Sequence, residues 1–82
     1  MIQAKVYVTL KKAVLDPQGK AVHNSLLSLG FEQVKEVRVG KLIELSLAVE
    51  DENEATALLN EMSRKLLANT VIEDFSFELQ QR

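Results

Sequence analysis

The chain has 82 residues, 46% of them hydrophobic, with a formal net charge of −2, one histidine and no cysteine. This length is enough for one domain, residues 1–82, whose single core supplies only about 3–5 kcal/mol of net stability. The composition excludes general disorder, a disulfide framework and a Cys/His metal centre, and the interspersed, slightly acidic charges argue against a nucleic-acid partner. Association with other chains is therefore the expected further source of stability.

Membrane insertion and export are not expected. No apolar run approaches the roughly 18 residues needed to cross a membrane. The first residues, Met1 to Lys5, lack the basic and then apolar pattern of a signal peptide. We therefore expect a cytoplasmic protein with no membrane partner.

The first expected element is a strand over residues 2–10. Its apolar residues recur at every second position, and this pattern predicts a strand with one face on the core. Tyr7 and Thr9 fall on the other face, where they are either simple surface or part of an interface.

Residues 9–20 join this strand to an amphipathic helix. Asp16 is suited to cap the helix through its carboxylate, and Pro17 fits the first helical position, where no amide donor is needed. The helix is expected over residues 17–29, with Gly30 as a left-handed stop. Lysines surround this corner, which is either an ordinary strand-to-helix turn or a site for an anion or a docking partner. The apolar stripe of the helix consists of Val22, Leu26 and Leu29.

Two strands are expected next, at residues 34–39 and 42–49, joined at Gly40 and Lys41. The register of this hairpin stays open. A two-residue turn places Val37 on the face opposite Ile43, whereas an odd-length turn with Gly40 in the left-handed region places both on one face. The odd-length turn is the favoured alternative.

A second helix and a last strand complete the chain. Residues 51–54 (Asp-Glu-Asn-Glu) are typical of a capped helix start, with a divalent-cation site as the alternative. Apolar spacing continues this helix to about Leu67, and Asn69 is the expected left-handed stop. Residues 71–79 form the last strand, with Phe75 and Phe77 on one face.

This order predicts an α+β fold, β-α-β-β-α-β, in which two helices cover one face of a four-stranded antiparallel sheet. The arrangement is a relative of the ferredoxin-like fold. The first and last strands are expected at the centre of the sheet, and the second face is left open.

No catalytic constellation is visible. A cysteine nucleophile is absent, the serines lie inside elements without a motif, and the only histidine, His23, is expected to be a partly exposed helix residue. A metal site needs three or four convergent ligands, which the sequence does not supply. We therefore predict no catalytic, cofactor-binding or metal-binding residue.

Two motifs together carry a resemblance to a known family, the Leu-Asp-Pro-Gln-Gly corner at residues 15–19 and the Arg-Val-Gly-Lys run at residues 38–41. With them, nearly the whole chain resembles the small subunit (PurS family) of phosphoribosylformylglycinamidine synthase. Two departures are Ser63, where such chains often carry cysteine, and Thr70, where they often carry proline.

The resemblance implies a non-catalytic assembly subunit of a glutamine-dependent, ATP-consuming ligase in the fourth step of purine biosynthesis. In that enzyme a glutaminase subunit releases ammonia, and a synthetase subunit activates the substrate with ATP and magnesium. The small subunit is then expected to bind no cofactor itself. It is expected to form a homodimer or tetramer that bridges both partners and supports ammonia transfer.

The expected interface residues lie on the first strand, the corner and the hairpin: Tyr7, Lys11, Leu15, Asp16, Pro17, Gly19, Arg38, Gly40, Lys41 and Leu42. Arg38 and Lys41 are expected as rim charges or ion-pair partners, with solvated charge as the alternative. Two other functions stay open: a regulatory domain that binds an amino acid or nucleotide at a dimer interface, and a small phosphate-handling enzyme. Strand exchange between chains is also open.

Overall fold

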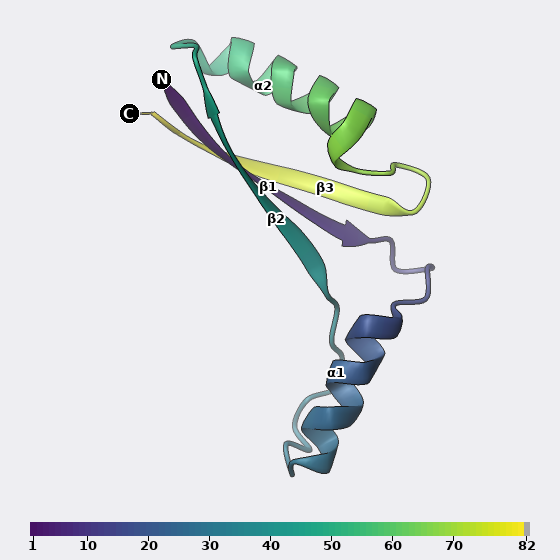
Figure 1. The fold of residues 1–82 in the computed structure, drawn as a ribbon. Helices are drawn as coiled ribbons and strands as arrows, with labels where there is room; N and C mark the ends of the chain where they lie inside the picture. The colour runs from purple at the N-terminus through teal and green to yellow at the C-terminus, as the bar shows by residue number, and fades with distance from the viewer. Residues whose placement is uncertain (82) are drawn as a thin grey trace.

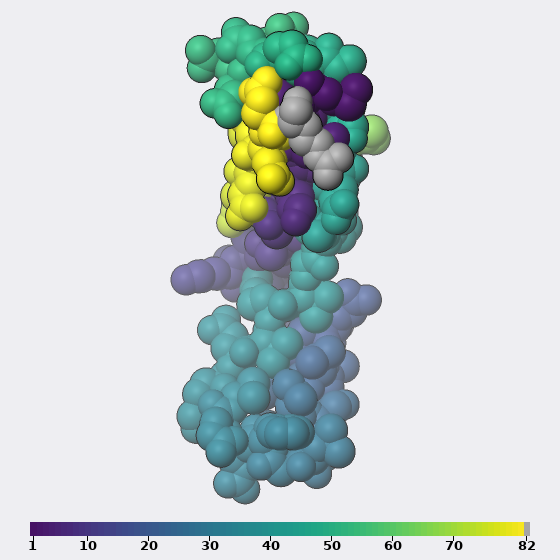
Figure 2. Space-filling view, turned by 90° about the vertical axis from the view of Figure 1, so that its left-hand side faces the viewer, coloured from purple at the N-terminus to yellow at the C-terminus, as the bar shows by residue number. Residues whose placement is uncertain are grey.

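The computed structural model describes residues 1–81. In chain order it contains β1 (Ile2–Leu10), α1 (Pro17–Ser28), β2 (Gly40–Leu47), α2 (Glu52–Met62), the π-helical turn η1 (Ser63–Leu67) and β3 (Glu73–Gln81). The strands form one antiparallel sheet in the order β2-β1-β3, and α2 lies over one face of it (Figure 1). Helix α1 lies beyond the end of the sheet, so the molecule is elongated, 48 × 28 × 14 Å (Figure 2).

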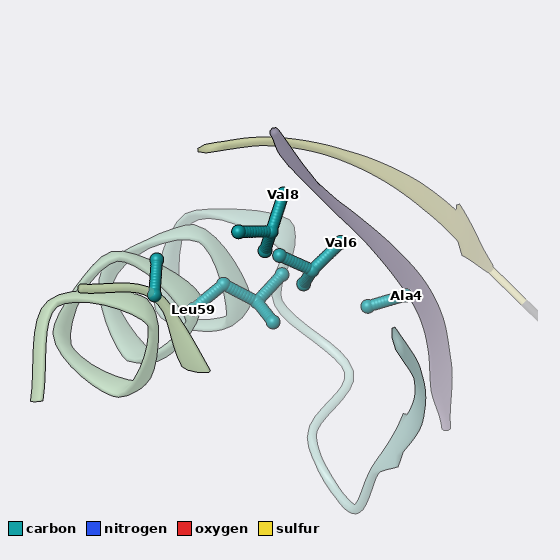
Figure 3. Close-up of a cluster of buried hydrophobic side chains, with 5 residues drawn as sticks. Ala4, Val6, Val8 and Leu59 are labelled. Atoms are coloured by element: carbon teal, nitrogen blue, oxygen red, sulfur yellow. The ribbon is translucent and has the colours of Figure 1, made fainter. Parts of the chain in front are cut away.

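Strand β1 carries the core, as its alternating pattern predicted. Val6 stands opposite Ile43 on β2 and Phe77 on β3. Leu59 of α2 is fully buried and belongs to the same cluster as Val6 and Val8 (Figure 3). Each fully buried aliphatic side chain of this size contributes about 1.5–3 kcal/mol, so the sheet and α2 make the stable body of the fold.

Within residues 1–81 the sheet has three strands, where four were predicted. Residues 34–39 belong to no helix or strand and pair with no strand, and the chain continues through Gly40 directly into β2. A left-handed turn at Gly40 does not form, because Gly30 (φ 97°) is the only residue with positive φ in this part of the chain. Instead, Gly40 lies so close to β1 that a Cβ atom there would be 2.5 Å from the Val8 carbonyl oxygen.

The helices begin where the sequence predicted, but they do not share one face of the sheet. Asp16 caps α1, and Asp51 caps α2 by accepting a hydrogen bond of 3.0 Å from the Asn53 amide. Helix α1 packs along residues 34–39, where His23 Nε2 lies 2.8 Å from the Val34 carbonyl oxygen (Figure 1). The sheet is therefore covered by one helix only. No helix of the described residues is long and apolar enough to span a membrane.

Helix α2 ends in the π-helical turn η1. The Ala68 amide donates to the Ser63 carbonyl oxygen at 2.8 Å, which is the five-residue spacing of a π-turn. Ala68 is extended and ends the helix, so the predicted left-handed stop at Asn69 is wrong. Ser63 is fully buried, and its hydroxyl has no hydrogen-bond partner.

Replacement of Ser63 by alanine is expected to raise the free energy of unfolding by about 1 kcal/mol, because it removes a buried hydroxyl that gains no bond on folding. In a domain of this size the melting temperature then rises by about 4–8 °C, which thermal circular dichroism measures. Ser76→Ala, at an exposed position of β3, is the matched control and is expected to change little. A lower melting temperature for Ser63→Ala would contradict the prediction.

Candidate functional site

Asp16 organises the corner between β1 and α1. Its two carboxylate oxygens accept hydrogen bonds from two separate segments: Oδ1 from the Gly19 amide in the first turn of α1, and Oδ2 from the Val39 amide just before β2, both at 2.9 Å. The Gly19 amide is the larger cause, and the Val39 amide the second, of a pKa of the Asp16 carboxyl below its ordinary value of 3.8. The residue is buried, so one side chain joins helix and strand.

Gly19 permits this close approach. A Cβ atom at position 19 would clash with the Val37 carbonyl oxygen and lie 2.6 Å from Asp16 Oδ2. The glycine is therefore required by contact between α1 and residues 34–39, and not by a turn. Pro17 fits the first turn because no partner is needed for an amide at that position.

Arg38 makes further hydrogen bonds across the corner. Its guanidinium donates to the Leu10 and Lys11 carbonyl oxygens at 2.7 and 2.8 Å. These two carbonyls lie where β1 ends, so Arg38 ties the end of the central strand to residues 34–39. Arg38 was expected as a rim charge or ion-pair partner; in this structure it is bonded within its own chain.

A cleft of about 440 Å³ opens beside the corner. Lys12, Lys20 and Lys35 line it, together with Asp16. The carboxylate of Asp16 already accepts the Gly19 amide at the helix start, so an incoming anion meets a like charge there. This geometry favours a structural corner over a phosphate-handling site. Among residues 1–81 no group of three or more His, Cys, Asp or Glu side chains is placed to hold a metal ion.

The other predicted site residues fall on two surfaces. Tyr7 and Leu42 stand opposite each other on the open face of the sheet, 37% and 51% exposed, whereas Leu15 is exposed at the corner. Lys11 and Lys41 form ion pairs with residues of β3: Lys11 Nζ lies 3.3 Å from Asp74 Oδ1, and Lys41 Nζ lies 3.6 Å from Glu73 Oε2. Gly40 stands beside Thr9 in the ladder.

The structure also shows a surface that was not among the predicted site residues. An apolar groove of about 460 Å³ lies between the end of α2, the turn η1 and strand β2. Leu45, Leu58 and Leu66 line it, and Leu66 is 83% exposed. The apolar spacing that predicted this helix to about Leu67 includes Leu58 and Leu66, but spacing alone does not indicate a groove.

Comparison with known proteins identifies the family. The family model described as "PurS: Phosphoribosylformylglycinamidine (FGAM) synthase" matches residues 3–81. The chain belongs to the PurS family. It is 48% identical over 81 residues to the PurS subunit of Bacillus subtilis, with 99% of this chain and 95% of that protein covered. It is 40% identical over 80 residues to the Methanocaldococcus jannaschii PurS subunit, with 98% and 96% covered.

Solved structures of this family have the same fold. The M. jannaschii PurS structure superposes with a TM-score of 0.90 at 39% identity, covering 100% of this chain and 99% of that one. A chain of PurLQS from Thermotoga maritima gives 0.86 at 25% identity, with 98% and 99% covered. The resemblance seen in the motifs is confirmed, and with it the role of a subunit of phosphoribosylformylglycinamidine synthase, a ligase of purine biosynthesis.

Replacement of Gly19 by alanine is expected to destabilise the chain by about 1–3 kcal/mol, because the new Cβ overpacks against Val37 and Asp16. Helix propensity alone predicts the opposite sign, since alanine is favoured over glycine by about 1 kcal/mol. Urea denaturation measures the difference, with Ser28→Ala at an exposed position of the same helix as the control. A stabilised Gly19→Ala variant would show that the close contact at the corner does not persist in solution.

Acid is expected to release the corner through Asp16. Because the folded-state pKa lies below the ordinary 3.8, the contribution of Asp16 to stability is present above that value and is lost as the pH falls through the folded pKa. The amide protons of Gly19 and Val39, followed by NMR, are expected to titrate together with a midpoint below 3.8.

Asp16→Asn is expected to remove the shared titration of the two amide protons and to make stability less dependent on pH between about pH 5 and pH 2. Asp51→Asn, which replaces the capping carboxylate of the other helix, is the matched control and leaves that titration in place. Separate midpoints for Gly19 and Val39 in the unmodified chain would contradict a single carboxylate between them.

Proposed function

We propose that this chain is a non-catalytic assembly subunit that bridges the glutaminase and synthetase subunits of phosphoribosylformylglycinamidine synthase and supports ammonia transfer between them. Its working form is a homodimer or tetramer in the cytoplasm. ATP and magnesium bind to the synthetase partner and not to this chain. The family assignment supports the proposal, and the related T. maritima chain comes from a structure of PurLQS.

The observation that carries the proposal is the exposed apolar surface on an ordered frame. On the open face of the sheet, Tyr7 stands opposite Leu42. The next pair of opposed residues on this face is charged and consists of Lys5 and Glu44. An aromatic and an aliphatic side chain surrounded by charges is the composition of an interface core with a polar rim. The hydrogen-bonded ladder below these side chains holds them in place before binding, which lowers the entropic cost of association.

The corner offers a second ordered contact surface. Leu15 is exposed there, next to a backbone that the bonds of Asp16 and Arg38 hold in one conformation. The hydrogen bonds of Asp16 and Arg38 are made within the chain. Replacement of these two residues therefore tests the shape of the corner, whereas replacement of exposed apolar residues tests binding itself.

Reconstitution separates assembly from catalysis. Purified chain, glutaminase subunit and synthetase subunit are mixed with glutamine and magnesium nucleotide, and complex formation is followed by size-exclusion chromatography with light scattering. Omission of the chain is expected to abolish glutamine-dependent synthesis and to leave synthesis from added ammonium intact, because a bridge matters only for transfer. Tight calorimetric binding of an amino acid or nucleotide to the isolated chain would favour the regulatory alternative.

Leu42→Ser is expected to weaken binding to the two large subunits about tenfold or more, as the loss of an interface anchor does. The side chain is half exposed in the free chain, so the melting temperature is expected to stay close to that of the unmodified chain. Val71→Ser, which removes a more exposed aliphatic side chain (80% against 51% for Leu42) outside the open face, is the control. Equal binding by both variants would exclude the open face as the contact.

A further inference from the structure

Three lysines around the corner have no ion-pair partner in the described part of the chain. Lys12, Lys20 and Lys35 are exposed and line the cleft of about 440 Å³. No ion pair joins any of the three to a carboxylate there, whereas the neighbouring Lys11 and Lys41 are each paired with an acidic residue of β3. The cleft therefore collects positive charges that the chain itself leaves unneutralised.

The acidic residues of the cleft do not cancel this charge. Four cationic side chains, the three lysines and Arg38, line it against two carboxylates, those of Asp16 and Glu36. The oxygens of Asp16 are turned to the Gly19 and Val39 amides, each at 2.9 Å. Negative charge is therefore attracted to the lysines, and not to the helix start, where a carboxylate already lies.

The fold brings the three lysines together from separate segments. Lys12 lies in a turn closed by a hydrogen bond of 2.9 Å from the Val14 amide to the Lys11 carbonyl oxygen. Lys20 belongs to α1, and Lys35 to the segment before β2. The bonds of the Asp16 carboxylate join the last two segments, so the backbone positions of the lysines are set before binding, which lowers the entropic cost of association.

The charge of Lys20 is not explained by the helix that contains it. A cation near the start of a helix opposes the helix dipole, and the first turn of α1 contains no acidic residue. The first turn of α2, by contrast, contains Glu52 and Glu54, which have the stabilising sign. A lysine at a position where helix stability favours a carboxylate indicates a role in binding.

The remainder of the molecule has the opposite charge. Residues 1–41 contain seven Lys or Arg and three Asp or Glu, whereas residues 42–81 contain two and nine. The acidic run at residues 50–54 follows the end of β2, and the corner lies where β2 begins (Figure 1). The two ends of a 48 Å body thus present opposite charges to an approaching protein, and the basic end selects an acidic surface.

The shape of the cleft favours a protein segment over a small anion. A small anion is best held by groups that converge on one point, such as the free amides of a helix start, and here Asp16 lies at that point. Leu15 lines the cleft and is 73% exposed. An apolar side chain surrounded by charges has the anatomy of a protein interface. A peptide with carboxylates on both sides of an apolar residue matches this surface.

We propose that the basic cleft, formed by Lys12, Lys20 and Lys35 around Leu15, docks an acidic segment of a large partner subunit. Asp or Glu side chains of that segment meet the lysines, and an apolar side chain meets Leu15. The docking rests on the assembly role proposed above and names one of its contacts. The acidic run of a second copy is a less suitable occupant, because contact between unlike ends of identical chains leads to open filaments unless the rotation closes a ring.

Carbodiimide cross-linking tests the contact directly, because this reagent joins a lysine amine to a carboxylate that touches it without a spacer. The full chain is mixed with both large subunits, glutamine and magnesium nucleotide, treated with the carbodiimide and analysed by peptide mass spectrometry. Amide bonds from Lys12, Lys20 or Lys35 to Asp or Glu of a large subunit are expected. Lys65 is the internal control, expected to couple to Glu61 of its own chain, 2.6 Å away.

The outcomes separate this contact from the assembly role itself. A complex that forms by light scattering but is never cross-linked through the three lysines overturns the docking and leaves the assembly role. Failure of the chain to bind either subunit overturns both. Amide bonds from the cleft only to residues 50–54 of a second copy overturn the docking, and so does calorimetric binding of inorganic phosphate that Lys20→Glu abolishes.

Charge reversal provides an independent measurement. The double variant Lys12→Glu/Lys20→Glu is expected to weaken binding to the cross-linked subunit about tenfold or more, since attraction is replaced by repulsion. Its melting temperature is expected not to fall, because glutamate near the start of α1 suits the helix dipole. Lys12→Arg/Lys20→Arg keeps the charge and is the matched control, expected to bind within about twofold of the unmodified chain.

Salt separates charge from shape in the same experiment. Between about 0.05 M and about 0.5 M salt the affinity of the unmodified chain is expected to fall more steeply than that of the glutamate variant, because salt screens exposed ion pairs. Equal affinities of the glutamate and arginine variants, or equal salt dependence of the glutamate variant and the unmodified chain, would overturn the docking.

Discussion

The carboxylate of Asp16 is the constraint on which the shape of this molecule depends. It accepts one amide from α1 and one from the segment that leads into β2, so a single side chain sets the direction in which the helix leaves the sheet. Gly19 makes room for that contact, and Arg38 closes it from the other side by bonding to the end of β1. The helix therefore points away from the body of the fold, and the partly uncovered α2 side of β2, the open groove and the length of the molecule are consequences of this one direction.

Local chemistry was predictable from the sequence, whereas the partner of the carboxylate was not. An Asp-Pro pair before an apolar stripe predicts a capped helix start, and the first oxygen of Asp16 has that role. The second oxygen bonds to Val39, 23 residues later, and no spacing rule in one sequence reports such a contact. The same limit applies to Arg38, whose backbone carbonyl partners carry no side-chain signal.

The absence of the predicted fourth strand is explained by the limits of an apolar sequence pattern. An apolar pattern of this kind predicts an extended segment with one apolar face, and three valines led to that prediction for residues 34–39, which belong to no strand. It does not show which surface the apolar face meets. Here that surface is α1, so the segment never reaches a neighbouring strand. Where the surface was the core, as for β1, the same pattern predicted both the strand and its buried face correctly.

A small chain with an incomplete interior is well suited to hold larger proteins together. A compact arrangement of 82 residues would bury its apolar side chains and leave little apolar surface for a partner to bind. This chain instead places a helix and a sheet at opposite ends of a 48 Å body, so that few residues span a long distance. The apolar surface left uncovered by that extension lowers the stability of the isolated chain. Burial of this surface on association would restore that stability. In the function proposed above, dependence on partners and the ability to bridge them have the same structural origin, the fixed direction of α1.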